Sequence, residues 1–131
     1  MAQVSKPRLI AGWLLVCLVG AMMVFAGAGK AFGFAPPDIV EGLKKAGALH
    51  DQIQLIGAGA MVTGILLIFP YTFSLGVLLA SSYWGGAIVT HMVQGESYAL
   101  PAGLLLATWI GAFLKEPRVL CSFFPKPAAG T

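Results

Sequence analysis

Charged residues are scarce in this sequence: they make up 10% of its 131 residues, whereas hydrophobic residues make up 58% and the mean hydropathy is +0.86. Soluble domains carry about 25% charged residues, so the composition predicts that lipid is the main solvent of the folded chain. Lys and Arg outnumber Asp and Glu by eight to five. They are scattered through the termini and predicted loops without interleaved aromatics, which argues against nucleic-acid binding.

Cysteine is also scarce, with only Cys17 and Cys121 present. The two lie far apart, neither belongs to a C-x-x-C pair, and no His or acidic residue stands beside them at the spacing of metal ligands. The pattern therefore argues against a thiol redox centre and against a metal site. Cys17 is interpreted as a small apolar packing residue.

The first long apolar run, Leu9 to Gly29, contains 21 residues without a charge. At about 1.5 Å per residue it forms a helix of about 31 Å, enough for one membrane crossing. A signal peptide is the alternative, because Lys6 and Arg8 resemble its basic start and Ala26-Gly27-Ala28 resembles a cleavage site. The run is longer than the apolar part of a usual signal peptide, which favours a retained helix.

The second apolar run, Gln52 to Thr90, has 39 uncharged residues and must fold back, because as one helix it would measure about 58 Å. Phe69-Pro70-Tyr71 marks the break, since proline removes a helix hydrogen bond and disfavours helix in the residue before it. We expect two helices here, at 53–69 and 72–93. Gly95 follows the second of them as a left-handed stop.

A fourth apolar segment, 98–114, has 17 residues and would span about 26 Å, which is short but sufficient for a crossing. Four crossings place the N-terminal residues 1–8 and the tail 115–131 on the same side of the membrane. Five basic residues fall on that side and three on the other, which favours cytoplasmic termini. The tail is interpreted as an interfacial anchor through Phe123, Phe124 and Lys126.

The connection between the first two crossings, 30–49, is too long for a simple turn. Pro37 to Lys45 predicts a short amphipathic helix, with Asp38 as its N-cap, Glu41 three residues later and Gly47 as its stop. An irregular solvated loop is the alternative. Together these segments predict an all-α, membrane-spanning four-helix bundle with a short amphipathic helix between the first and second crossings.

Small residues recur at four-residue spacing on the last three predicted crossings. In lipid such residues let helix backbones approach closely, so they indicate helix-packing faces. The pattern leaves open whether the partner helix belongs to this chain or to another. The predicted packing residues are Ala60, Gly64, Ser82, Gly86, Gly103, Ala107 and Gly111.

Polar residues gather where the second crossing begins and where the third ends, which the predicted topology places at one depth. Asp51 and His91 are candidates for a proton-accepting or ligand-binding pair, with Tyr83 deeper on the helical face of His91. The alternative is that each merely suits its helix end, since the helix dipole favours an acid at the start and a His at the end. Trp84 is a candidate for stacking on a quinone, although a deep Trp more often only packs.

Three stretches of the sequence, 57–70, 75–80 and 83–91, resemble the DoxX-like family, most specifically in Gly-Gly-Ala-x-x-Thr-His at 85–91. The resemblance covers nearly the whole chain after residue 8. It implies a four-helix protein of a bacterial-type cytoplasmic membrane and draws attention to Thr90 beside His91, without implying a catalytic role. The wider DoxX group includes a membrane subunit of a thiosulfate:quinone oxidoreductase and relatives implicated in membrane redox complexes or in the assembly of other proteins.

Three hypotheses about function follow. The first is an accessory or assembly subunit, not an enzyme on its own, that docks other membrane subunits or copies of itself through its small-residue faces. The second is a membrane subunit of a quinone-linked oxidoreductase of the thiosulfate:quinone type, in which Asp51 and His91 handle protons and Tyr83 or Trp84 lines the quinone pocket. The third is a small-molecule transporter, which four short helices can form only as an oligomer.

Overall fold

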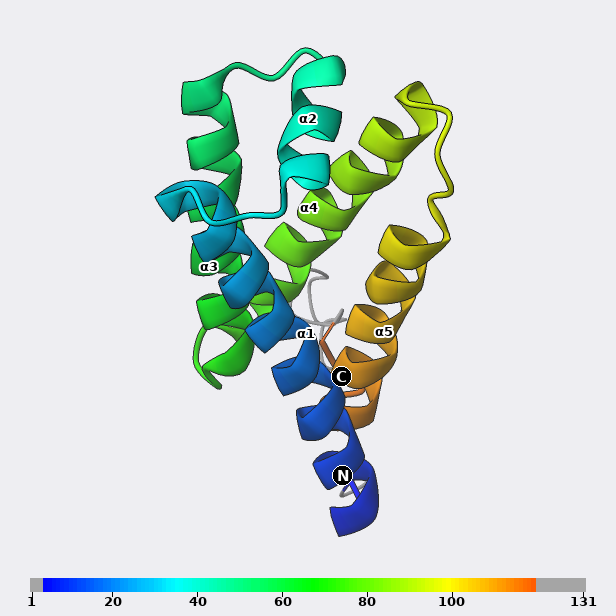
Figure 1. Cartoon of the computed structure of the whole chain (residues 1–131). Coiled ribbons are helices and arrows are strands. Elements are labelled where there is room, and N and C mark those ends of the chain that lie inside the picture. The colour runs from blue at the N-terminus through cyan, green and yellow to red at the C-terminus, as the bar shows by residue number, and fades with distance from the viewer. Residues whose placement is uncertain (1–3, 120–131) are drawn as a thin grey trace, which may run out of the picture.

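A computed structural model describes residues 4–119, which fold into helices without strands (Figure 1). This confirms the predicted all-helical class, including the short helix between the first two long ones. The predicted tail residues Cys121, Phe123, Phe124 and Lys126 lie outside the described residues. The helices are α1 (Lys6–Phe32), α2 (Pro37–Lys45), α3 (His50–Ile68), α4 (Phe73–Val93) and α5 (Ala99–Lys115).

Three of these helices are long and apolar enough to cross a membrane: α1 with 27 residues, α3 with 19 and α4 with 21. The helix α5 is apolar but shorter, with 17 residues. Large apolar side chains point outward all around the bundle, among them Leu14 at 67% exposure and Leu55 at 71%. Such an exterior suits a surface that faces lipid.

The helix α1 extends three residues beyond each end of the predicted range 9–29. Proline suits a first helical turn, which lets the helix begin ahead of Pro7. Gly33, with φ of +86°, ends it. Arg8 and Lys30 therefore mark the ends of the apolar run but lie inside the helix. Lys30 thus projects from the last turns of α1 and not from the loop that follows.

The short helix α2 begins at Pro37, with Pro36 in the N-cap position and no side-chain cap. Asp38 therefore lies in the first turn and is not the N-cap, which corrects the prediction. Its carboxylate still lies near the positive end of the helix dipole. Gly47 and Gly95 have φ of +95° and +69°, so the predicted stop after α2 and the predicted left-handed stop after α4 are confirmed, and both glycines are left-handed.

The four long helices form a ring in which α1 and α4 each pack against α3 and α5. The helix α2 lies outside this ring at one end of the bundle, against α3, while the start of α1 lies at the opposite end (Figure 1). Apolar side chains from the long helices fill the centre, among them Val16, Val19 and Met23 of α1, Leu67 of α3, Val77 and Trp84 of α4 and Ala112 of α5.

Glycines bring α1 and α3 into backbone contact. A Cβ at Gly27 would lie 2.5 Å from the carbonyl oxygen of Gly57, and one at Gly64 would lie 2.5 Å from that of Gly20. Each helix thus contributes two glycines seven residues apart. Any side chain at these positions would force the helices apart.

The predicted small-residue faces divide into two groups in the structure. Ala60 and Gly64 on α3 are buried, and Gly111 on α5 is buried against α1, while Ala107 packs on the core. Ser82, Gly86 and Gly103 are exposed, and a Cβ at either glycine would meet no atom within 4 Å. No helix among residues 4–119 covers them.

Candidate functional site

A cavity of about 480 Å³ lies at the α2 end of the bundle; we call it the α2 pocket. Small-molecule sites commonly measure about 300–1,000 Å³, so the cavity has the size of a ligand site. Its polar lining comes from Lys30 of α1, from Asp38 of α2, from Ser82, Tyr83, Thr90 and His91 of α4, and from Gln94 and Glu96 after α4. Its apolar lining includes Ile39 and Leu43 of α2, Ile56 of α3 and Ala87 of α4.

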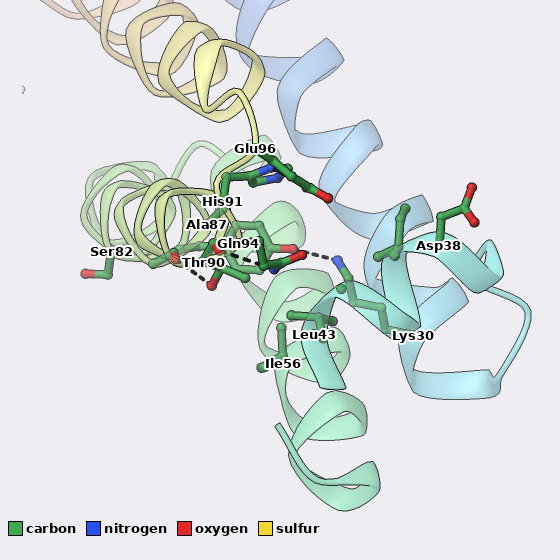
Figure 2. Close-up of a pocket in the computed structure, with 14 residues that line it drawn as sticks. Lys30, Asp38, Leu43, Ile56, Ser82, Ala87, Thr90, His91, Gln94 and Glu96 are labelled. Atoms are coloured by element: carbon green, nitrogen blue, oxygen red, sulfur yellow. Dashed lines mark hydrogen bonds and ion pairs between the residues drawn. The ribbon is translucent and has the colours of Figure 1, made fainter. Parts of the chain in front are cut away.

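The most distinctive feature of the α2 pocket is the contact between Lys30 and Tyr83. Lys30 Nζ donates a hydrogen bond of 2.9 Å to the Tyr83 hydroxyl, halfway along α4 (Figure 2). Among residues 4–119, no carboxylate lies within 4 Å of this half-buried ammonium, and the carboxylate of Asp38 points away from it in Figure 2. Two ammonium N–H groups and the phenol O–H remain as donors for a ligand.

The close contact between α1 and α3 directs Lys30 into the pocket. A Cβ at Gly57 would lie 2.8 Å from Lys30 Cβ and 2.6 Å from the backbone nitrogen of Ala31. The Lys30 side chain therefore starts directly against the α3 backbone, on its way to α4. Sequence reasoning missed Gly57, although its seven-residue spacing from Gly64, matched by Gly20 and Gly27, was a usable signal.

The predicted face of α4 lines the pocket. Residues three and four apart on a helix lie on the same side, so they line a cavity together when that side faces it. The residues of α4 and its end that line the pocket in this way are Tyr83, Ala87, Thr90, His91 and Gln94. The Thr90 hydroxyl donates to the carbonyl of Gly86 at 2.9 Å, and the Gln94 side chain donates to the carbonyl of Thr90 at 3.2 Å. The Thr90 hydroxyl proton is therefore used within its own helix.

Trp84 does not line the α2 pocket. Its ring is buried in the core, 5.0 Å from the Tyr83 ring in an edge-to-face arrangement, and its indole N–H has no partner in the described chain. It supports Tyr83 from behind through an aromatic contact. The structure thus separates the two aromatic residues predicted as alternatives for a ligand wall.

The acidic residue beside His91 is Glu96, and not Asp51 as predicted. His91 Nδ1 lies 3.3 Å from a Glu96 carboxylate oxygen, close enough for an ion pair when the imidazole is protonated, although it makes no hydrogen bond. Glu96 reaches this place because the left-handed Gly95 turns the chain back, and the Glu96 N–H donates to the His91 carbonyl at 2.9 Å. Asp51 is exposed and does not line the pocket.

The helix α2 explains the separation of Asp51 from His91. It lies between the ends of α3 and α4 in Figure 1, and a Cβ at Gly42 would lie 2.8 Å from Gln94 Oε1. The pocket thus combines the donors of Lys30 and Tyr83, the His91 imidazole and an apolar wall in one lining. Among residues 4–119, no group of three or more His, Cys, Asp or Glu side chains could hold a metal ion.

The helices define a small helical membrane protein, and its largest described features include a cavity with both polar groups and apolar walls. The model of the DoxX-like family matches residues 14–113, and the chain belongs to this family. Family membership and the apolar helices together make it a multi-pass membrane protein. The comparison with curated proteins finds no match, and neither does the comparison with solved structures.

Proposed function

We propose that this protein is an accessory membrane subunit that holds a quinone-class ligand in the α2 pocket for a larger quinone-linked oxidoreductase. The hydrogen-bonded pair of Lys30 and Tyr83 carries the proposal, because it leaves N–H and O–H donors at one end of a cavity with apolar walls. A quinone carbonyl accepts hydrogen bonds, while its ring and tail are apolar. The carbonyl therefore accepts hydrogen bonds from Lys30 and Tyr83, and the ring and tail contact the apolar walls.

Lys30 favours the reduced forms of such a ligand. As a quinone takes up electrons from the partner enzyme, negative charge develops on its carbonyl oxygen. An ammonium group without an acidic partner stabilises that charge strongly in a medium of low dielectric constant. This chain binds and orients the ligand, and the partner enzyme delivers the electrons.

His91 and Glu96 provide an exchange point for protons. Reduction of a quinone to a quinol consumes two electrons and two protons. His91 lines the same pocket as Lys30, and its side chain is 37% exposed. An imidazole can accept a proton at one ring nitrogen and release one from the other, so in this proposal His91 passes protons between water and the pocket.

Gly86 provides an exit for an apolar tail. It is exposed on α4, lines the pocket and leaves open space where a side chain would stand. Val89, three residues further along α4, is 59% exposed on the helix surface. In the proposed orientation both termini are cytoplasmic, and the pocket lies at the outer side of a bacterial-type cytoplasmic membrane.

The test is a titration of the detergent-purified protein with a short-tailed benzoquinone, followed by quenching of tryptophan fluorescence. Lys30→Met should weaken binding by about 10-fold or more, since a hydrogen bond from a charged donor contributes about 1.5–3 kcal/mol. Lys44→Met is the matched control, because Lys44 is exposed on α2 and does not line the pocket. No saturable binding, or equal affinity of the Lys30→Met variant, would contradict the proposal.

The docking part of the proposal rests on Gly103. This exposed glycine on α5 leaves room for a helix backbone, which is how membrane helices approach one another. Purification from native membranes in mild detergent should retain partner subunits, and Gly103→Leu should release them without weakening quinone binding. A chain that elutes alone from native membranes would contradict the accessory role.

A further inference from the structure

A second cavity lies at the opposite end of the bundle, where α1 projects beyond α5. A Cβ at Gly12 would lie 2.6 Å from the backbone nitrogen of Lys115, so the last residue of α5 meets α1 one and a half turns above its start. The segment Lys6–Ala11 therefore continues past α5 by about 9 Å, as the lower part of Figure 1 shows.

The space beside this projecting turn is a cavity of about 480 Å³, which we call the terminal notch. Three segments that are distant in sequence enclose it: the start of α1, the turn that joins α3 to α4, and the end of α5. Its walls are Leu9, then Pro70, Phe73 and Ser74, then Lys115, Glu116 and Arg118.

Positive charge in the terminal notch is not balanced by ion pairs. Among residues 4–119, no carboxylate lies within 4 Å of Lys115 or Arg118. Arg8 does not line the notch, but it ties α1 to the same end of α5, since its guanidinium donates to the carbonyl of Phe113 at 3.0 Å. Glu116 is the one acid among the lining residues, and its carboxylate accepts a hydrogen bond of 3.0 Å from the Arg118 backbone N–H.

Two aromatic rings hold the Lys115 side chain in place. Its ammonium nitrogen lies 3.7 Å from the centre of the Trp13 ring and 3.4 Å from the centre of the Phe73 ring. Cation–π contacts from α1 and α4 therefore hold the side chain in position. A fixed cation loses little conformational entropy when it binds an anion.

We propose that the terminal notch binds the phosphate head group of an anionic phospholipid. A phosphate presents the acceptor oxygens that lysine and arginine recognise. Leu9 and Phe73 supply the apolar wall for the glycerol and first acyl carbons, and the lipid-facing surface continues from Leu9 to Ile10, which is 59% exposed. This proposal is independent of the quinone proposal, because the two cavities lie at opposite ends of the bundle.

The ends of three long segments meet at the notch, which places it at the depth of the head groups when the bundle crosses a bilayer. Anionic lipid attracts cations at that depth. Free phosphate offers the same oxygens without the apolar part. The apolar wall favours the lipid.

The experiment measures lipid binding to the full-length protein by native mass spectrometry and by the shift in melting temperature. Phosphatidylglycerol should bind at least 10-fold more tightly than phosphatidylcholine, which carries the same phosphate without net charge. Inorganic phosphate at the same concentration should give no shift. Equal effects of the two lipids, or a full shift with inorganic phosphate, would overturn the proposal.

Variants locate the binding. Arg118→Gln should weaken phosphatidylglycerol binding several-fold with the fold intact, since its side chain is exposed, and the double variant with Lys115→Gln should weaken it further. Glu116→Gln should strengthen it, because the one nearby negative charge is lost. Lys44→Gln with Lys45→Gln is the control, which removes two charges from α2. If this control weakens binding as much as Arg118→Gln does, the lipid is held by overall charge and the terminal notch is not its site.

Discussion

Gly64 on α3 and Gly86 on α4 are the same residue type in opposite surroundings. A side chain at Gly64 would collide with the α1 backbone, whereas one at Gly86 would meet no atom within 4 Å. Both belong to the same sequence pattern of small residues four apart. The difference teaches that a glycine inside a helix of this bundle can bring two backbones together or can leave space open beside the helix.

The two uses of glycine are connected through Lys30. Because the glycines of α1 and α3 bring their helices into contact, Lys30 starts against the α3 backbone and its ammonium reaches Tyr83. Because α4 leaves open space at Gly86, the cavity around that pair remains accessible. We call the glycine contact between α1 and α3 the closed half of the bundle and the α2 pocket beside Gly86 the open half. The closed half thus positions the Lys30 ammonium, which lines the open half.

The largest expected effect comes from filling the closed half. Gly64→Leu should reduce the free energy of unfolding by about 3 kcal/mol or more, since overpacking against a backbone cannot be relieved by a side-chain rotation. Thermal unfolding in detergent with size-exclusion chromatography measures it. Gly103→Leu is the control at an open position, and a similar loss there would remove the distinction between the two kinds of glycine.

Gly57→Ala should connect packing with ligand binding. Its Cβ would lie 2.6 Å from the Ala31 nitrogen and 2.8 Å from Lys30 Cβ, so we expect a loss of about 1–3 kcal/mol in stability together with weaker quinone binding. Gly59→Ala, on the same helix with open space around it, should change neither. Normal quinone affinity in a destabilised Gly57→Ala variant would show that the contact does not position Lys30.

Tyr83→Phe removes one hydroxyl from the open half. The loss of a neutral hydrogen bond corresponds to about 1 kcal/mol, so quinone affinity should fall about five-fold. Tyr98→Phe, at the exposed start of α5, controls for the general effect of deleting a phenol oxygen. A Tyr83→Phe variant that binds quinone as tightly as the unaltered protein would indicate that Lys30 acts alone.

Glu96→Gln should have the smallest effect. When the solution is acidic enough to protonate His91, losing a half-exposed ion pair should cost about 0.5 kcal/mol, within the usual range for such pairs. Asp51→Asn should cost nothing measurable, because Asp51 is exposed and forms no ion pair in the described chain. The melting temperatures of the two variants at acidic pH show whether Glu96 or Asp51 is the acidic partner of His91. A larger change in Asp51→Asn would support the pairing of Asp51 with His91 that the sequence predicts.

Local features of this fold were predictable from the sequence because they depend on neighbouring residues. The left-handed stop at Gly95, the break before Pro70 and the shared face of Tyr83 and His91 all follow from backbone preferences or from helical periodicity. Helix ends were less predictable. At Lys30 the apolar run stops while the helix continues to Phe32, since charge does not end a helix.

Contacts between distant segments were not predictable in the same way. The sequence places His91 and Asp51 at one depth and so predicts that they pair. Depth does not specify which sides of two helices face each other, and α2 separates the two residues. Glu96 lies close to His91 because the chain turns back at Gly95. The presence of a glycine at the end of the helix was enough to suggest this turn. Gly86 could not be assigned to a cavity, since periodicity does not identify the neighbours of a face.

The most direct test fills the open half without touching the closed one. In the quinone titration, Gly86→Leu should lower affinity by about 10-fold or more, because the new side chain occupies the cavity at its exit. Its melting temperature should stay close to that of the unaltered protein, since no atom lies within 4 Å of the new Cβ. Unchanged quinone affinity in a normally folded Gly86→Leu variant would contradict the assignment of the α2 pocket as the ligand site.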